Sequence, residues 1–383
     1  MHFQLTDDQK LIQDTAREFA QNELAPLAGK FDEEQRFPSE IVGRLAELGF
    51  MGMFVPEEFG GAGTDNLSYI IAVEEISRVC ASTGVIVSVN NSLVCHPLLK
   101  FGSDEQKRRV LTPLAKGQKL GAYSLTEPGS GSDAASLRTV AVKKGDRYVL
   151  NGRKCFVTNG PNADFVLIFA TIDPTKRSKG ICCFIVEKGM KGFSVGTIEK
   201  KMGIRAALSC ELVLDDVEVP AANLLGEEGQ GFKVAMNTLD GGRNGIAAQA
   251  LGIAQASLDA SVRYAKERVQ FGKPIAEFQA VQWMLADMKT SIDAARLLTY
   301  RAAVSKETQE YYGLETAEAK LFASHVAVDC AIKAVQIHGG AGYMHDHPVE
   351  RFMRDSKITE LYEGTSEIQR LVIANNVLKA AAK

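Results

Sequence analysis

The stretch Leu361–Arg370 holds residues that could carry out acid–base chemistry beside a bound anion. Glu363 is a carboxylate next to a glycine and two hydroxyl residues, directly before an apolar helical pattern that starts at Ile368. A carboxylate in such a turn can face a reacting group from a fixed scaffold. Thr365 or Ser366 would cap the following helix, whose free N–H groups suit an anion or a phosphate. The stretch therefore predicts a general base beside a cofactor clamp, although helix capping alone would also explain it.

A glycine-rich loop at Thr126–Ala134 is the second candidate site. Its residues Gly129–Ala134 fit the dinucleotide fingerprint G-x-G-x-x-A. The residues that follow, 136–142, have a strand-like pattern, so no helix opens there to receive a pyrophosphate. The loop instead offers small residues and hydroxyls, which let the backbone approach a flat ligand closely.

Two stretches in the C-terminal half, Arg268–Gly272 and Gln336–Tyr343, combine glycine with polar residues. Each could be only the end of a helix, because a cation is favourable at a helix C-terminus and glycine is a common C-cap. Adjacent glycines such as Gly339 and Gly340 would also allow close contact with the phosphate groups of a ligand.

Composition excludes several classes of protein. With 383 residues, a prior of roughly 150 residues per domain predicts two or three domains, and 45% hydrophobic residues are enough for large cores. The net charge of −3 gives no field for nucleic acid or an anionic membrane. No run approaches the ~18 apolar residues of a membrane span, and the N-terminus lacks a basic segment followed by an apolar core. We expect a cytoplasmic protein without nucleic-acid or membrane partners.

The cysteine and histidine patterns indicate neither disulfides nor a metal. The seven cysteines are scattered without Cys-x-x-Cys spacing, and many have apolar neighbours, so we expect reduced thiols in the core. His345 and His347 form a metal-like cluster, but two histidines two residues apart lack the further ligands that zinc needs. We expect no metal.

Three regions of different periodicity must position these candidates. From the capping box Thr6-x-x-Gln9 onward, residues 1–120 show helical spacing. Residues 121–228 carry short β-branched and aromatic runs, and Asn151-Gly152 between two of them predicts a hairpin turn. Helical spacing returns in residues 229–383. The predicted fold class is α+β, with an N-terminal all-α domain, a middle antiparallel β-domain and a C-terminal domain like a four-helix bundle.

Taken together and in this order, these motifs resemble those of the flavin-dependent acyl-CoA dehydrogenases. The motifs that carry the resemblance are Thr126–Asp133, Asn151–Thr158, Arg268–Gly272, Gln336–Gly340 and Tyr362–Thr365. The resemblance covers the whole chain and is closest to the short-chain, butyryl-CoA-type branch. It implies the acyl-CoA dehydrogenase fold, with FAD between the β-domain and the C-terminal helices and acyl-CoA on the other face of the flavin.

The resemblance also implies roles for single residues. Glu363 matches the base that takes the α-proton while the β-hydrogen leaves as hydride to the flavin, and burial should raise its pKa. Gly242 matches the position where some branches carry this acid instead. The implied substrate-binding residues are Ser132, Asp240, Gly241, Gly242, Arg243 and Gly364. The implied cofactor-binding residues are Tyr123, Leu125, Thr126, Gly131, Ser132, Phe156, Val157, Thr158, Gln270, Phe271, Thr365 and Glu367, with Arg268, Gln279, Gln336, Gly339 and Gly340 serving a neighbouring subunit.

The activity implied by the resemblance is the α,β-dehydrogenation of a short-chain, small cyclic or branched acyl-CoA to the 2-enoyl-CoA, a step of fatty-acid β-oxidation. The electrons would pass to an electron-transfer flavoprotein, and the protein would be a homo-oligomer, a dimer of dimers. Two alternatives stay open at this point. One is a non-catalytic flavoprotein or acyl-CoA-binding module, and the other is an oxidase that uses oxygen directly.

Overall fold

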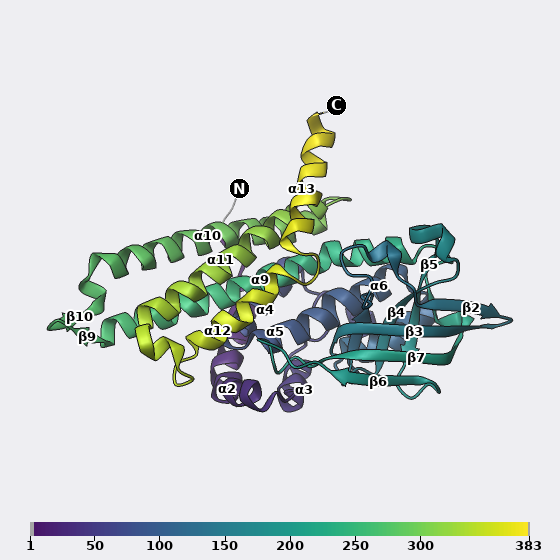
Figure 1. Cartoon of the computed structure of the whole chain (residues 1–383), viewed down its shortest axis with the longest axis horizontal. Helices are drawn as coiled ribbons and strands as arrows, with labels where there is room; N and C mark the ends of the chain where they lie inside the picture. The colour runs from purple at the N-terminus through teal and green to yellow at the C-terminus, as the bar shows by residue number, and fades with distance from the viewer. Residues whose placement is uncertain (1–3, 382–383) are drawn as a thin grey trace.

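The first third of the chain is helical in the computed structural model, which describes residues 4–381 (Figure 1). α1 begins after Thr6, whose hydroxyl accepts a hydrogen bond from the Gln9 backbone N–H in the predicted capping box. α4 is the central helix of this region, since every residue from Ser68 to Ser77 is buried. The α-helices are α1 (Asp7–Phe19), α2 (Ala25–Glu34), α3 (Ser39–Glu47), α4 (Asn66–Val79), α5 (Ala81–Ser88), α6 (His96–Phe101), α7 (Asp104–Gln106) and α8 (Thr112–Ala115).

The middle of the chain forms one eight-stranded sheet with the order β6-β7-β3-β2-β4-β5-β8, and β1 pairs with β4. Most neighbouring strands are antiparallel, as predicted, but β1 and β2 each pair with β4 in parallel. The strands are β1 (Gly121–Ser124), β2 (Val140–Lys144), β3 (Arg147–Thr158), β4 (Phe165–Thr171), β5 (Ile181–Glu187), β6 (Phe193–Ile198), β7 (Ser209–Pro220) and β8 (Leu224–Leu225).

The prediction of a hairpin turn at Asn151-Gly152 is wrong, because both residues lie inside β3. The pairing of β3 with β7 shifts register between Leu150 and Gly152, which marks a bulge rather than a turn. The Asn151 amide donates to the Asp216 carboxylate at 2.9 Å and accepts from the Asp216 backbone N–H at 2.9 Å. These reciprocal bonds stabilise the extended strand at a sequence that favours turns elsewhere.

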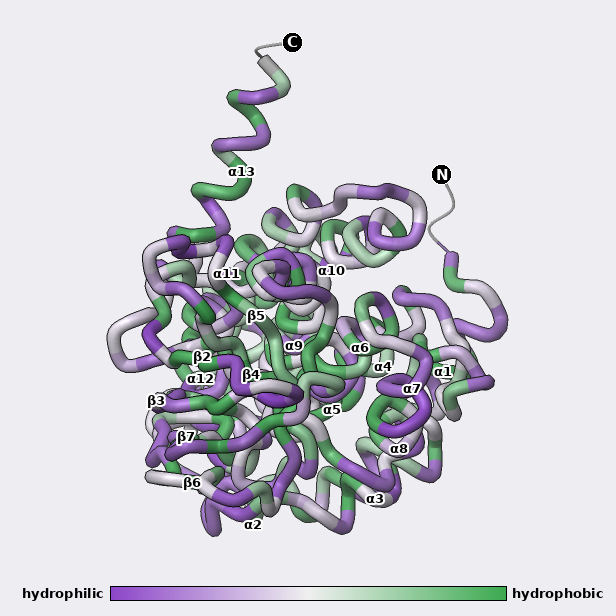
Figure 2. The backbone as a smooth tube through the Cα atoms, turned by 90° about the vertical axis from the view of Figure 1, so that its right-hand side faces the viewer, coloured by the Kyte–Doolittle hydropathy of each residue, from purple (hydrophilic) through white to green (hydrophobic). Residues whose placement is uncertain are grey.

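Helices return after the sheet. α9 (Gly231–Glu267), α10 (Gln279–Thr308) and α11 (Gly313–His338) pack side by side as a bundle, and the small hairpin of β9 (Val269–Gln270) and β10 (Lys273–Pro274) lies at the end remote from the sheet (Figure 1). α12 (Val349–Ser356) packs against α9 and α11. α13 (Ser366–Ala381) extends away from the rest of the molecule in two perpendicular views (Figures 1 and 2).

Strands β4 and β5 join the sheet to the helices because they are buried on both faces. Alternate residues of β4, such as Leu167 and Phe169, belong to a core shared with the helices. The residues between them, Val166 and Ile168, belong to a second core inside the β-domain. The site described below therefore sits on a rigid junction of sheet and helices.

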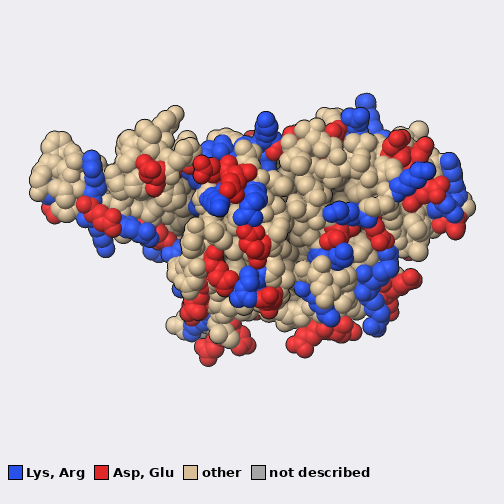
Figure 3. All heavy atoms as spheres, turned by 90° about the horizontal axis from the view of Figure 1, so that it is seen from below, with Lys and Arg blue, Asp and Glu red and all other residues tan. Residues whose placement is uncertain are grey.

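The structure also bears on the predictions about the cysteines, the surface charge and membrane-spanning helices. All seven cysteines are buried free thiols, which confirms the prediction of core thiols. Lysine and arginine alternate with acidic residues over the face seen in Figure 3, in agreement with the small net charge. Within residues 4–381, no helix combines the length and apolar character needed to cross a bilayer.

Candidate functional site

A cavity of about 660 Å³ lies where the β-domain meets the C-terminal helices. Four parts of the chain form its walls: α5 with the π-helix Val89–Cys95 after it, the β1 and β3 ends with the loop after β1, the first turns of α9, and the segment before α13. Among its lining residues are the candidate base Glu363 and the candidate loop residues Gly131 and Ser132. The fold thus brings together the first two stretches identified in the sequence.

Glu363 lies in a tight turn between a short 3₁₀ helix, Lys357–Glu360, and α13. Its backbone has φ +52° and that of Gly364 has φ +92°, so the turn passes through the left-handed region twice. Thr365 caps α13 by accepting a hydrogen bond from the Ile368 N–H at 3.4 Å. This geometry confirms that the carboxylate stands in a turn directly before a helix.

The Glu363 carboxyl is shielded from solvent although the residue as a whole is only half-buried. Its Oε2 atom has no hydrogen-bond partner among the described residues. Burial raises the pKa of this carboxyl to about 7, while the nearby Lys320 and Arg243 cations oppose the rise. A carboxyl that ionises near neutral pH and faces a cavity is suited to general-base chemistry.

α9 makes room for this carboxyl. A β-carbon added to Gly242 would overlap Glu363 Oε2, so the carboxylate packs against bare helix backbone. The next residue of α9, Arg243, is buried and lies 2.8 Å from Asp240 in an ion pair. The Nε atom of Arg243 has no hydrogen-bond partner among the described residues, so a donor remains for a ligand in the cavity.

The β-domain wall of the cavity fits a flavin ring. Phe156 lines the cavity with 67% of its surface exposed and φ +58°, which offers an aromatic group on an open wall. The hydroxyl residues Thr126, Ser132 and Thr158 lie around it. The buried Tyr123 hydroxyl has no partner among residues 4–381. An apolar face with polar groups at its edges matches the surface of an isoalloxazine.

A buried ion pair fixes the loop after β1. Lys154 is fully buried and its ammonium lies 2.8 Å from Glu127, and it also donates to the Leu125 carbonyl at 3.2 Å. The Glu127 carboxylate in turn accepts the backbone N–H groups of Arg138 at 2.6 Å and Thr139 at 2.9 Å. Sequence reasoning included Glu127 in the loop Thr126–Ala134 but missed this role, whose only local signal is a lysine directly before the apolar residues Cys155–Val157 of β3.

The structure gathers most, but not all, of the residues implied for the site. The cavity lining includes Tyr123, Leu125, Thr126, Gly131, Ser132, Phe156, Thr158, Arg243, Glu363, Gly364 and Thr365. The Val157 side chain points into the core of the β-domain, and Glu367 is exposed on α13. Asp240, Gly241 and Gly242 lie on α9 beside the cavity.

A second group of implied residues lies at the remote end of the helical bundle. Phe271 in the β9–β10 turn is 94% exposed, and α10 begins and α11 ends at the same end (Figure 1). The group comprises Arg268, Gln270, Phe271, Gln279, Gln336, Gly339 and Gly340. The contact of this group with a cofactor stays a prediction, as does the assignment of Arg268, Gln279 and Gln336–Gly340 to the cofactor of a neighbouring subunit.

The apolar walls of the cavity were missed by sequence reasoning. Val85, Val89 and Leu93 come from the N-terminal region, and Phe232 and Met236 come from the start of α9. In the sequence these residues recur at helical spacing, which is also the pattern of ordinary core residues. No local signal separates the two roles.

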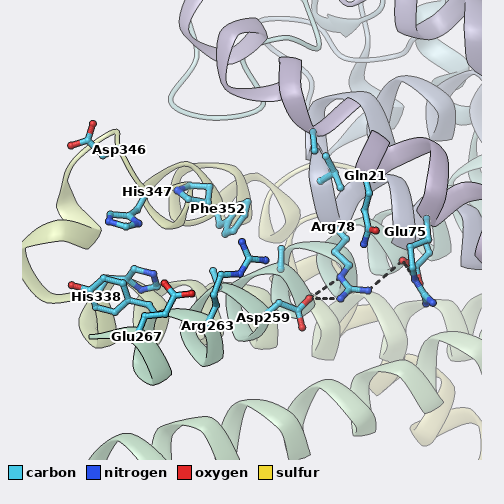
Figure 4. A pocket seen from close by; sticks show the side chains of 17 residues that line it. Gln21, Glu75, Arg78, Asp259, Arg263, Glu267, His338, Asp346, His347 and Phe352 are labelled. Atoms are coloured by element: carbon cyan, nitrogen blue, oxygen red, sulfur yellow. Dashed lines mark hydrogen bonds and ion pairs between the residues drawn. The ribbon is translucent and has the colours of Figure 1, made fainter. Parts of the chain in front are cut away.

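A larger cavity, about 710 Å³, lies between the N-terminal helices and α9 and α12 (Figure 4). Its buried carboxylate, Glu75, lies 2.7 Å from Arg17 and 3.5 Å from Arg78, and Arg78 also lies 2.6 Å from Asp259. The buried Glu75 carboxylate is therefore neutralised by the two arginines that pair with it. The smaller cavity, with its unpartnered Glu363 carboxyl, is the better candidate for chemistry.

Comparison with known proteins gives matches along the whole chain. Sequence profiles described as the N-terminal, middle and C-terminal domains of acyl-CoA dehydrogenase match residues 6–118, 122–217 and 229–378. The short-chain-specific acyl-CoA dehydrogenase of Clostridium acetobutylicum is 53% identical over 379 residues, which cover 99% of this chain and 100% of that protein.

Two solved structures are similar over almost the full length. Butyryl-CoA dehydrogenase from Megasphaera elsdenii superposes with a TM-score of 0.97 at 47% identity, covering 99% of this chain and 100% of that one. A chain in a structure described as the electron transferring flavoprotein of Acidaminococcus fermentans superposes with a TM-score of 0.98 at 51% identity, with the same coverage of 99% and 100%.

Proposed function

The chain belongs to the acyl-CoA dehydrogenase family, and from this premise we propose that Glu363 is the base with which it dehydrogenates a short-chain acyl-CoA. The reaction oxidises the CH–CH group next to the thioester, and FAD is the cofactor. One observation carries the assignment to Glu363. Its carboxyl is buried on the cavity wall without a hydrogen-bond partner in the described chain, and its pKa is raised to about 7.

In the proposed step, the α-carbon of the acyl group loses its hydrogen as a proton to the Glu363 carboxylate. The electron pair of that C–H bond forms the C=C bond of the 2-enoyl-CoA. When bound, FAD supplies the acceptor for the β-hydrogen, which leaves as a hydride. The Arg243 guanidinium favours the ionised form of Glu363 before the transfer, and the apolar walls exclude water.

The lining supports a small apolar acyl group as the substrate. Val85, Val89 and Leu93 present only hydrocarbon to the cavity. A methylene more or less is worth about 1–3 kcal/mol in such a pocket, so linear, branched and cyclic short chains compete closely. Ser132, Arg243 and Gly364 line the cavity with polar groups and are proposed to bind the thioester end, together with Asp240–Gly242 on α9.

We further propose a homo-oligomer, a dimer of dimers, in which the remote bundle end of one copy binds the cofactor of another. Large apolar side chains that a single copy leaves exposed support this proposal: Phe271 is 94% exposed, Trp283 64% and Leu378 68%. Sedimentation of the FAD-loaded protein measures the number of copies directly.

An electron-transfer flavoprotein is the proposed electron acceptor, and fatty-acid β-oxidation is the proposed pathway. The similarity to a chain in a structure described under the name of an electron transferring flavoprotein supports this acceptor. A direct reaction of the reduced flavin with oxygen is the competing outcome. The experiment below distinguishes it from electron transfer to the flavoprotein.

Anaerobic titration with linear, branched and cyclic short-chain acyl-CoA thioesters tests the function. We expect the yellow flavin spectrum to bleach with the preferred substrate and to recover when an electron-transfer flavoprotein is added. A flavin that no acyl-CoA reduces would contradict the dehydrogenase assignment. Recovery with oxygen at the same rate as with the flavoprotein would identify an oxidase instead.

A further inference from the structure

Lys320 is a buried cation whose role the reaction above does not use. It lies on α11, its side chain is fully buried, and its ammonium donates to the Gly364 carbonyl at 2.7 Å. That neutral carbonyl is its hydrogen-bond partner among the described residues, where no carboxylate lies within ion-pair distance. Burying an ammonium with only a neutral acceptor costs desolvation free energy. A functional role for the charge would explain why it is there.

The carbonyl that Lys320 holds belongs to the turn that presents the candidate base. Glu363 has φ +52°, a backbone conformation that residues other than glycine rarely adopt unless their surroundings impose it. The Gly364 carbonyl accepts a second hydrogen bond, from the Gln369 amide at 2.8 Å, and the same amide donates to the Glu363 carbonyl at 3.3 Å. One charged side chain, Lys320, and one neutral side chain, Gln369, therefore both donate hydrogen bonds to this turn.

We propose that Lys320 is a positioning residue for Glu363, holding the Glu363–Gly364 turn through the Gly364 carbonyl and placing a positive charge behind the carboxylate. The inference rests on the proposed function of Glu363 as the base. Lys320 does not itself line the cavity and makes no hydrogen bond to the carboxylate oxygens, so it acts through the turn and through its charge.

The charged and titratable groups around Lys320 and Glu363 decide whether the ionised or the neutral form of the Glu363 carboxyl is favoured. Arg243 from α9 adds a second positive charge to the Glu363 carboxyl, and the tyrosines near it, Tyr69, Tyr123 and Tyr362, have raised pKa values and stay neutral. Burial lowers the pKa of Lys320 to about 8, with Glu363, Glu360 and Glu367 opposing this and Arg243 adding to it. At neutral pH the ammonium is therefore charged and favours the ionised base.

The test compares Lys320→Met with Gln369→Leu in the FAD-loaded protein. Both changes remove one hydrogen bond from the Gly364 carbonyl, but only the first removes a charge. Stopped-flow flavin reduction is measured across the pH range, and infrared spectra follow the protonated-carboxyl band of Glu363, identified by its absence in Glu363→Gln. The infrared titration reports the protonation of the carboxyl without turnover.

We expect Lys320→Met to move the midpoints of the reduction-rate profile and of the infrared titration to higher pH. Well below the parent midpoint, reduction then slows by up to about tenfold for each unit of displacement. Gln369→Leu should slow reduction at every pH with the midpoints in place. Lys320→Arg, which restores the charge, should return the midpoints toward the parent values. If Lys320→Met does not fold, Lys320→Gln provides the neutral variant for the same measurements.

Midpoints that stay at the parent values in the neutral variant would overturn the proposal and leave Lys320 as an ordinary structural clamp. Unchanged reduction rates in both variants would overturn it as well. Failure of the proposed function looks different, because Glu363→Gln would then reduce flavin at the parent rate whatever happens at Lys320.

Discussion

Glu363 and Gly242 occupy adjoining space so closely that a β-carbon on Gly242 would overlap the carboxylate oxygen Oε2. The same β-carbon would also lie 2.6 Å from the Leu93 side chain, so a side chain at position 242 would force both neighbours to shift. The absence of a side chain at position 242 is thus a condition for the position of the carboxyl on the cavity wall.

Gly242→Ala is therefore expected to displace the Glu363 carboxyl while leaving α9 helical. A displacement of about 1 Å in a reacting group can slow a reaction about 10²-fold, and we expect a loss of that order in flavin reduction. Stopped-flow measurement with saturating acyl-CoA gives the rate. The control is Gly43→Ala on α3, where a β-carbon meets nothing within 4 Å, and which should reduce flavin normally. Equal rates in both variants would contradict the packing argument.

Glu363→Gln tests the base itself. The variant keeps the size of the side chain but cannot accept the α-proton, so flavin reduction should fall by about 10²–10⁴-fold. Binding of FAD and of acyl-CoA should be retained, because the loss belongs to the chemical step. A reduction rate within about threefold of the parent rate would show that another group takes the proton.

The raised pKa of Glu363 also predicts how stability depends on pH. Because its pKa is about 7 in the folded protein and 4.5 ordinarily, its contribution to stability is fully present below pH 4.5 and is lost as the pH rises through 7. The loss is at most about 3 kcal/mol. Glu363→Gln has no such loss, so its thermal-unfolding midpoint should rise relative to that of the parent between about pH 4.5 and about pH 7. A constant difference across this range would mean that the carboxyl is solvated.

Lys154→Met tests whether the buried pair with Glu127 holds the loop against the cofactor. Removing one partner of a buried ion pair typically costs about 3–5 kcal/mol, so a lower unfolding midpoint and weaker FAD retention are expected. Arg153→Met is the matched control, since the neighbouring Arg153 is exposed and lies 3.3 Å from Glu211 in a surface pair worth about 1 kcal/mol or less. FAD retention after gel filtration and a thermal melt of each variant provide the comparison. Similar losses in both would remove the special role of Lys154.

Local patterns in the sequence were sufficient for the order of helices and strands and for the turn at Glu363. The capping box at Thr6 and the return of helical spacing after the sheet are properties of neighbouring residues, which is why they could be predicted. The Asn151-Gly152 hairpin failed for the same reason. Its turn preference is local, whereas the bonds between Asn151 and Asp216 that keep β3 extended join residues on separate strands.

Only the tertiary structure decided the properties of the candidate base. The ordered motifs of the sequence pointed to Glu363, to a flavin and to a base whose pKa is raised by burial. They could not say which residues surround the carboxyl or that its Oε2 atom has no hydrogen-bond partner in the described chain. That burial depends on Gly242 of α9, and the charge behind the turn comes from Lys320 of α11. These residues are far from position 363 along the chain, and burial and electrostatic fields depend on distance in space, so folding alone brings their effects to Glu363.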